Sequence, residues 1–123
     1  MGLADSVRFL GQVADVSALY QGMDVFAFPS LYEGFGMALL EAQIAGLPSV
    51  VSNRVSPEVV LSDGCRLVPL EDGAGAWARE IWAQFEGGKR EATASEAFER
   101  FDIDGASKKL EGFYLRLREG AMR

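Results

Sequence analysis

The sequence predicts an α/β fold built around a parallel β-sheet. Short apolar runs alternate along the chain with stretches in which apolar residues recur at helical spacing, which is the pattern of strand–helix units. One of these runs, residues 25–28, is continuous, as expected for a strand that is buried on both faces of a parallel sheet. The length of 123 residues suits one domain, and 49% hydrophobic with 24% charged residues is the composition of a globular protein.

Two predicted strands flank a helix near the start of the chain. Residues 7–10 form a short apolar run that ends at Gly11, and we predict a strand there. Asp15 is a suitable N-cap for a helix whose apolar residues recur at helical spacing up to about Gly22. Residues 25–28 are a continuous apolar run and predict the second strand.

The middle of the chain continues the same alternation. A helix is predicted over about residues 35–45, because a Gly-Leu-Pro stop signal follows it at residues 46–48. Strands are expected at residues 49–52 and 66–68, with a short turn or helix at residues 57–61 between them.

The last third of the chain has a helical pattern. Helices are predicted over residues 76–85 and 89–100, and Asp104 is expected to cap a third. The apolar face of this third helix combines Leu110, Phe113, Tyr114 and Leu117. We therefore divide the chain into strand–helix units at residues 1–70 and C-terminal helices at residues 71–123.

Charge and residue usage argue against several classes of function. The formal charge of -6 disfavours a nucleic-acid-binding surface, which needs a basic stripe. The absence of histidine removes the usual general base and the Ser–His and Cys–His nucleophile pairs. Cys65 is the single cysteine and lies in an apolar stretch, which indicates a buried core thiol and a reducing, cytoplasmic setting.

The segment with the clearest chemistry is residues 29–42, Pro-Ser-Leu-Tyr-Glu-Gly-Phe-Gly-Met-Ala-Leu-Leu-Glu-Ala. It follows the carboxyl end of a predicted buried strand, the edge at which open α/β sheets bind their ligands. Gly34 and Gly36 allow the backbone to approach a ligand closely, and the first N–H groups of the following helix have no partners inside it. Together with the helix dipole, these N–H groups suit a phosphate or diphosphate.

Two carboxylates bracket this turn. Glu33 precedes the helix and Glu41 lies eight residues later, so a mostly helical connection would separate them by roughly 12 Å and let both face one groove. Carboxylates accept hydrogen bonds from paired hydroxyls, so the arrangement suits a sugar–diphosphate–ribose ligand. From spacing alone, two glutamates near a helix start are more commonly a partner of the dipole and a member of a solvated face.

Residues 29–48 resemble the E-x7-E signature of the retaining family 4 glycosyltransferases of the GT-B fold, in the form PSLYEGFG-x-x-LLEA-x-x-x-GLP. The resemblance continues upstream through VRFLGQV and MDVFAFPS and downstream through PSVVS and PEVVLSDGCRLVPLED, and so covers nearly the whole chain. The segment EAQIAGLPSVVSN is most similar to the family members that build exopolysaccharide. The resemblance implies an incomplete doubly wound parallel sheet, the C-terminal Rossmann-like domain of GT-B, followed by C-terminal helices.

The resemblance implies a role for each matching position. Glu33 would be the catalytic-site carboxylate that binds hydroxyls of the donor sugar, and Glu41 would bind the ribose. Backbone amides of residues 34–37 would hold the diphosphate, and residues 12–13 would lie beside the nucleobase. The implied donor-binding residues are thus Gln12, Val13, Glu33, Gly34, Phe35, Gly36, Met37 and Glu41.

The resemblance also implies the reaction and its partners. Such an enzyme transfers a hexose from a UDP- or GDP-sugar to a saccharide or lipid-linked acceptor in polysaccharide biosynthesis, with no metal or other cofactor required. It works in the cytoplasm or peripherally at the inner face of the cell membrane. Family members add an N-terminal acceptor domain and two further strand–helix units with an Arg and a Lys that clamp the diphosphate. Neither Arg8 nor Arg54 occupies that motif, so we expect this chain to bind the donor and to be inactive alone.

The strand order of a doubly wound sheet predicts a bare edge. In the order 3-2-1-4-5-6, the strand at residues 7–10 would not touch the strand at residues 25–28. An exposed apolar edge favours pairing with another strand. We therefore expect either a homodimer through this edge or an N-terminal segment that repacks across it.

Two other functions fit parts of the sequence. A non-catalytic nucleotide-binding or interaction module would keep the phosphate-binding turn and act through the sheet edge or the C-terminal helices. A GT-B-shaped epimerase fits less well, because such an enzyme is expected to supply acid–base histidines and this chain has none.

Overall fold

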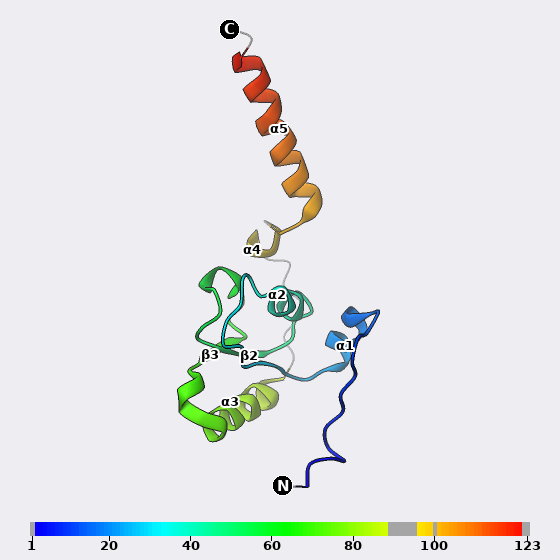
Figure 1. The fold of residues 1–123 in the computed structure, drawn as a ribbon, viewed down its shortest axis with the longest axis vertical. Coiled ribbons are helices and arrows are strands. Elements are labelled where there is room, and N and C mark those ends of the chain that lie inside the picture. Colours follow the sequence, from blue (N-terminus) through cyan, green and yellow to red (C-terminus); the bar gives the residue numbers. More distant parts are fainter. Residues whose placement is uncertain (1, 89–95, 100, 122–123) are drawn as a thin grey trace.

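The computed structural model describes residues 2–88, 96–99 and 101–121 (Figure 1). In chain order its elements are α1 (Val16–Gly22), β1 (Phe26–Phe28), α2 (Met37–Ile44), β2 (Ser49–Ser52), the 3₁₀ helix η1 (Pro57–Val59), β3 (Cys65–Val68), the 3₁₀ helix η2 (Leu70–Asp72), α3 (Gly73–Gly87), α4 (Glu96–Glu99) and α5 (Ile103–Ala121).

The three strands form a parallel sheet in the order β1-β2-β3. Ser49 of the central strand lies opposite Phe26 of β1 and Cys65 of β3. A consecutive parallel order is that of one half of a doubly wound sheet. The predicted fold class, an incomplete doubly wound α/β domain followed by C-terminal helices, is therefore confirmed.

Helices cover both faces of the sheet, with α2 on one side and α3 on the other (Figure 1). Because successive strand residues point to opposite faces, Val50 packs against Trp77 of α3 and Val51 packs with Leu39 of α2. Both valines are completely buried. This two-sided burial explains why all four residues of β2 are buried, with no alternation of buried and exposed positions.

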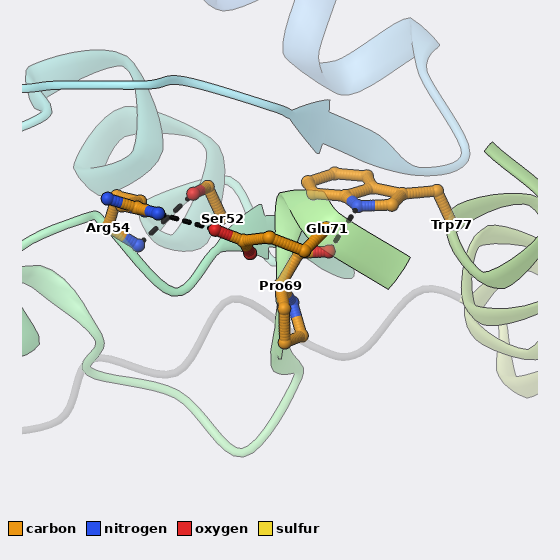
Figure 2. Close-up of polar contacts among 5 residues, drawn as sticks. All are labelled: Ser52, Arg54, Pro69, Glu71 and Trp77. Atoms are coloured by element: carbon orange, nitrogen blue, oxygen red, sulfur yellow. Dashed lines mark hydrogen bonds and ion pairs between the residues drawn. The ribbon is translucent and has the colours of Figure 1, made fainter. Parts of the chain in front are cut away.

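A hydrogen bond anchors α3 to the end of β3. The indole Nε1 of Trp77 donates to the carbonyl of Pro69 at 3.1 Å (Figure 2). The ring is 8% exposed and packs against Val50 and Val68. A buried indole with a partner for its N–H fixes the position of the helix without leaving a polar group unpaired.

The side chain of Gln43 ties α2 to the segment that follows β2. Its Nε2 donates to the carbonyls of Leu39 (3.2 Å) and Val59 (2.7 Å). Its Oε1 accepts from the amides of Leu61 (2.9 Å) and Ser62 (3.0 Å). The side chain is 3% exposed, so these four bonds satisfy backbone groups that water reaches poorly.

The predicted strand at residues 7–10 is wrong. These residues have no regular structure and are exposed, Phe9 to 97%. A strand depends on a neighbouring strand for its backbone hydrogen bonds, and within the described residues none lies beside this segment.

Two helix starts also differ from the prediction. Helix α2 begins at Met37 and not near residue 35, because Gly36 has φ +87°, in the left-handed region that a right-handed helix excludes. Helix α5 is capped by Asp102 and not by Asp104: Oδ2 of Asp102 accepts from the amide of Gly105 at 2.8 Å. Asp104 lies in the first turn.

The C-terminal helices lie beyond the sheet in chain order. Helix α5 projects away from the sheet and its covering helices (Figure 1). The four residues predicted for its apolar face are each between 49% and 62% exposed. Of the helix predicted over residues 89–100, α4 covers Glu96–Glu99, and residues 89–95 and 100 lie outside the described residues.

Replacing Gln43 with leucine tests its structural role. Gln43→Leu leaves the carbonyl of Val59 and the amides of Leu61 and Ser62 without their partner, so we expect a loss of about 3 kcal/mol in the free energy of unfolding. Urea denaturation followed by circular dichroism measures the loss. Glu80→Leu, at an exposed position of α3, is the control and should change the stability by less than about 0.5 kcal/mol. Equal stability of the two variants would contradict the assignment.

Candidate functional site

The turn that joins β1 to α2 depends on one glycine. Gly36 is the N-cap of α2 and is buried, with φ +87°. A Cβ there would meet Val55 and Val59 at 3.7 Å, an ordinary contact distance, so there is space for a side chain. Glycine is required because of the left-handed backbone conformation. The carbonyl of Gly36 accepts from the amides of Leu39 (3.0 Å) and Leu40 (3.2 Å).

The start of α2 can accept an anion. The amides of Met37 and Ala38 belong to the first turn, where an α-helix offers no internal acceptors. They lie at the carboxyl end of β1, together with the positive end of the helix dipole. Gly34 is exposed and no heavy atom lies within 4 Å of a Cβ placed on it, so this part of the turn is open.

Glu33 lies on the same turn. Its Oε1 accepts from the hydroxyl of Ser30 at 2.7 Å, and its side chain is half-buried. The hydroxyl therefore holds one carboxylate oxygen, and the other remains able to accept from a ligand.

The side chain of Phe35 is partly buried and is engaged in packing. Its ring packs against the core cluster that includes Leu39 of α2, and it lies 5.2 Å from the ring of Phe101, measured between centroids. Met37, in contrast, exposes 57% of its surface at the start of the helix.

Glu41 lines a groove between α1 and α2. The groove has a volume of about 720 Å³, within the usual size range for small-molecule sites, and is lined by Ala14, Asp15, Val16, Ser17, Tyr20, Gln21, Glu41, Ile44 and Ala45. The hydroxyl of Tyr20 donates to Oε2 of Glu41 at 3.3 Å. The pKa of Tyr20 is raised, mainly by burial and secondly by the charge of the Glu41 carboxylate. The hydroxyl is therefore protonated and can donate.

The structure brings together some of the predicted site residues and not others. Glu41 lines the groove, whereas Glu33 does not. The helical connection assumed between the two carboxylates is present only from Met37 onward, so the 12 Å estimate does not apply. Gln12 and Val13 immediately precede Ala14, where the lining of the groove begins.

Tyr20 is a groove residue that the sequence pattern did not single out. It is one of the residues that recur at helical spacing before Gly22, and its ring is buried against α2. The signal available in the sequence was the residue type, because a core tyrosine needs a partner for its hydroxyl.

Arg54 is engaged elsewhere on the surface. Its guanidinium pairs with the carboxylate of Glu71 and its amide donates to the hydroxyl of Ser52 at 3.1 Å (Figure 2). The pKa of Glu71 is lowered, first by a hydrogen bond from the backbone of Glu71 itself and then by the hydrogen bond from Arg54. The two side chains are 53% and 60% exposed, so the pair contributes little to stability.

Neither the thiol of Cys65 nor the acidic residues of the described ranges form a nucleophilic or metal-binding centre. Burial raises the pKa of Cys65 to about 11, so the thiol is protonated and a weak nucleophile at neutral pH. Within residues 2–88, 96–99 and 101–121, no three of Cys, Asp and Glu come together as a metal site would require. Nor does any helix of the described chain have the length and apolarity to cross a membrane.

The chain matches the family described as glycosyl transferases group 1 over residues 1–86. Over 120 residues it is 37% identical to the phosphatidyl-myo-inositol mannosyltransferase of Mycolicibacterium smegmatis, covering 91% of this chain and 31% of that protein. Over 57 residues it is 49% identical to the O-antigen chain mannosyltransferase B of Escherichia coli, covering 44% of this chain and 15% of that protein.

A third relative is the UDP-Gal:alpha-D-GlcNAc-diphosphoundecaprenol alpha-1,3-galactosyltransferase of Escherichia coli, 45% identical over 53 residues, or 43% of this chain and 14% of that protein. The chain thus spans less than a third of the length of each of these relatives. The family match extends over more than half of the chain and includes β1, the glycine turn and α2. The chain therefore belongs to the group 1 glycosyltransferases, within family 4.

Proposed function

We propose that this chain is the donor-binding part of a retaining hexosyltransferase that uses a nucleotide-diphosphate sugar, UDP- or GDP-linked. The observation that carries the proposal is a helix, α2, whose open start follows β1 and whose Glu41 lines the groove against α1. The galactosyltransferase relative has UDP-Gal in its name, and two other relatives are mannosyltransferases, which supports a hexose donor.

The site offers a complementary group for each part of such a donor. The first amides of α2, with the backbone of residues 34–37, hold the diphosphate. Glu41 accepts from the ribose hydroxyls, and Glu33 accepts from hydroxyls of the hexose. Gln12 and Val13 lie beside the nucleobase, next to the groove lining that begins at Ala14.

Catalysis in this proposal comes from positioning. The donor is held so that its anomeric carbon faces the acceptor, and the amides at the start of α2 stabilise the charge that develops on the leaving diphosphate. No cofactor takes part. Since the chain spans less than a third of its relatives, we propose that the acceptor, a saccharide or lipid-linked saccharide in polysaccharide biosynthesis, binds to the remainder of the enzyme. The chain alone then binds the donor without transferring the sugar.

We place the enzyme in the cytoplasm, or peripherally at the inner face of the membrane, because the name of one relative describes a diphosphoundecaprenol-linked acceptor.

A non-catalytic nucleotide-binding or interaction module is the second candidate. The exposed apolar face of α5 favours it, since such a face suits a partner.

Replacing Glu41 tests nucleotide binding. Glu41→Ala removes the acceptor for the ribose hydroxyls, and hydrogen bonds to a charged group are worth about 1.5–3 kcal/mol, so affinity should fall by about 10- to 100-fold. Titration calorimetry of the 123-residue chain with UDP and GDP measures the affinity. Glu111→Ala, which removes an exposed carboxylate from α5, is the matched control. Unchanged affinity in the Glu41 variant would refute the assignment of this residue.

Replacing Glu33 tests the catalytic-site assignment in the full-length enzyme. Glu33→Ala should lower kcat/KM for sugar transfer by about 100-fold or more, since contacts to the reacting sugar stabilise the transition state. The affinity for UDP or GDP without the sugar should stay within a factor of about three. Glu86→Ala, an exposed change on α3, should leave transfer unaffected. Full activity of the Glu33 variant would show that its role is different.

We further propose that the outer edge of β1 pairs with a second copy of the chain. Strand β1 has a neighbour on one side only in the described sheet, and Ala27 at its centre is exposed. Analytical ultracentrifugation should show a dimer at micromolar concentrations, and Ala27→Lys should shift it to the monomer, since a charge on an edge strand opposes pairing. Wild-type chain that stays monomeric throughout would rule out this interface.

A further inference from the structure

Tyr20 has a ring in the core and a hydroxyl at the edge of the groove. The residue is 6% exposed and its ring packs with Ala42 and Leu47. It meets the ring of Phe26 edge-on, with centroids 5.8 Å apart and planes at 80°. Phenylalanine would fill the same apolar space, so core packing alone does not account for the hydroxyl group.

The hydroxyl has a partner on the neighbouring helix. It donates to Oε2 of Glu41 across the contact between α1 and α2, over a distance of 3.3 Å. This is longer than the 2.5–2.7 Å typical of a hydroxyl bound to a carboxylate, so the bond adds little stability. Its effect is to favour one orientation of the carboxylate.

Glu41 needs such an orientation if it binds a ribose. Its side chain is exposed on α2 and has three rotatable bonds, so in the absence of a contact it samples several rotamers. Two adjacent hydroxyls can both be accepted only when the carboxylate faces them correctly. The hydroxyl of Tyr20, whose ring is fixed in the core, selects that orientation before the ligand binds and so reduces the entropic cost of binding.

The second carboxylate in the groove, that of Asp15, has a different role. The carboxylate of Asp15 accepts from the amide of Ala18 at 3.1 Å as the N-cap of α1. That bond keeps the first turn of α1 formed, and the same short helix carries Tyr20 to Glu41. The cap thus maintains the helix, and the tyrosine contacts the carboxylate.

We propose that Tyr20 is a positioning residue, which orients the Glu41 carboxylate toward the ribose hydroxyls and so makes the site selective for ribonucleotides. The inference rests on the proposed donor-binding function and deepens it. It separates two contributions of the tyrosine, the packing of its ring and the direction that its hydroxyl gives to Glu41.

Tyr20→Phe tests this, because it keeps the ring and removes the hydroxyl. Calorimetry compares the variant with wild-type chain for UDP, GDP and their 2′,3′-dideoxy analogues. We expect the affinity for UDP or GDP to fall by about three- to tenfold, the range of one ordinary hydrogen bond. The affinity for the dideoxy analogues should not change, because they lack the hydroxyls that Glu41 accepts. A purely structural role would weaken both kinds of nucleotide equally.

Two further variants complete the experiment. In a Glu41→Ala background, Tyr20→Phe should cause no additional loss for UDP or GDP, since the group that it orients is gone. Tyr114→Phe removes a hydroxyl from a tyrosine that is 62% exposed on α5, and it should bind every nucleotide as the wild type does. The melting temperature of each variant, followed by circular dichroism, shows whether the fold is retained.

The outcomes separate this inference from the proposed function. If the wild-type chain binds neither UDP nor GDP, the proposed function fails and the inference fails with it. If binding depends on Glu41 and Tyr20→Phe has no effect, or weakens the dideoxy analogues equally, only the inference is overturned. A loss confined to the ribonucleotides that disappears in the Glu41→Ala background supports it.

Discussion

The structure depends on the burial of β2 on both of its faces. Val50 and Val51 are completely buried against opposite layers, and this burial requires a helix on each side of the sheet. At about 25 cal/mol per Å² of apolar surface, covering both faces of a central strand is a main favourable contribution in so small a sheet. Trp77 secures the layer of α3, and Gln43 secures the layer of α2.

The site follows from this arrangement. Parallel strands end at one edge, so the turn after β1 opens where α2 begins, and Gly36 provides the left-handed backbone that the turn needs. Because α2 must pack on the sheet through Leu39 and Leu40, Glu41 faces away from the core toward α1. The groove is thus a consequence of how α1 packs against α2.

Most of the fold could be predicted from sequence because its signals are local. The short strand at residues 49–52, the Asp15 cap and the turn at residues 29–36 each depend on neighbouring residues, and each is present in the structure. The strand at residues 7–10 was also predicted from local apolar residues, and that prediction failed because a strand also needs a partner. Local pattern likewise placed the α5 cap at Asp104, although Asp102 makes the contact.

Sequence alone was sufficient for the α/β class and for the family, and it singled out Glu33, the glycine turn and Glu41 as candidates for the site, because one short motif contains them. The packing of the folded chain was needed to show that Tyr20 meets Glu41, 21 residues away, and that Glu33 lies outside the groove. A cap or a turn forms within a few residues of chain, so a local pattern reveals it. A hydrogen bond between two helices depends on how their surfaces pack, which residues distant in the sequence decide together.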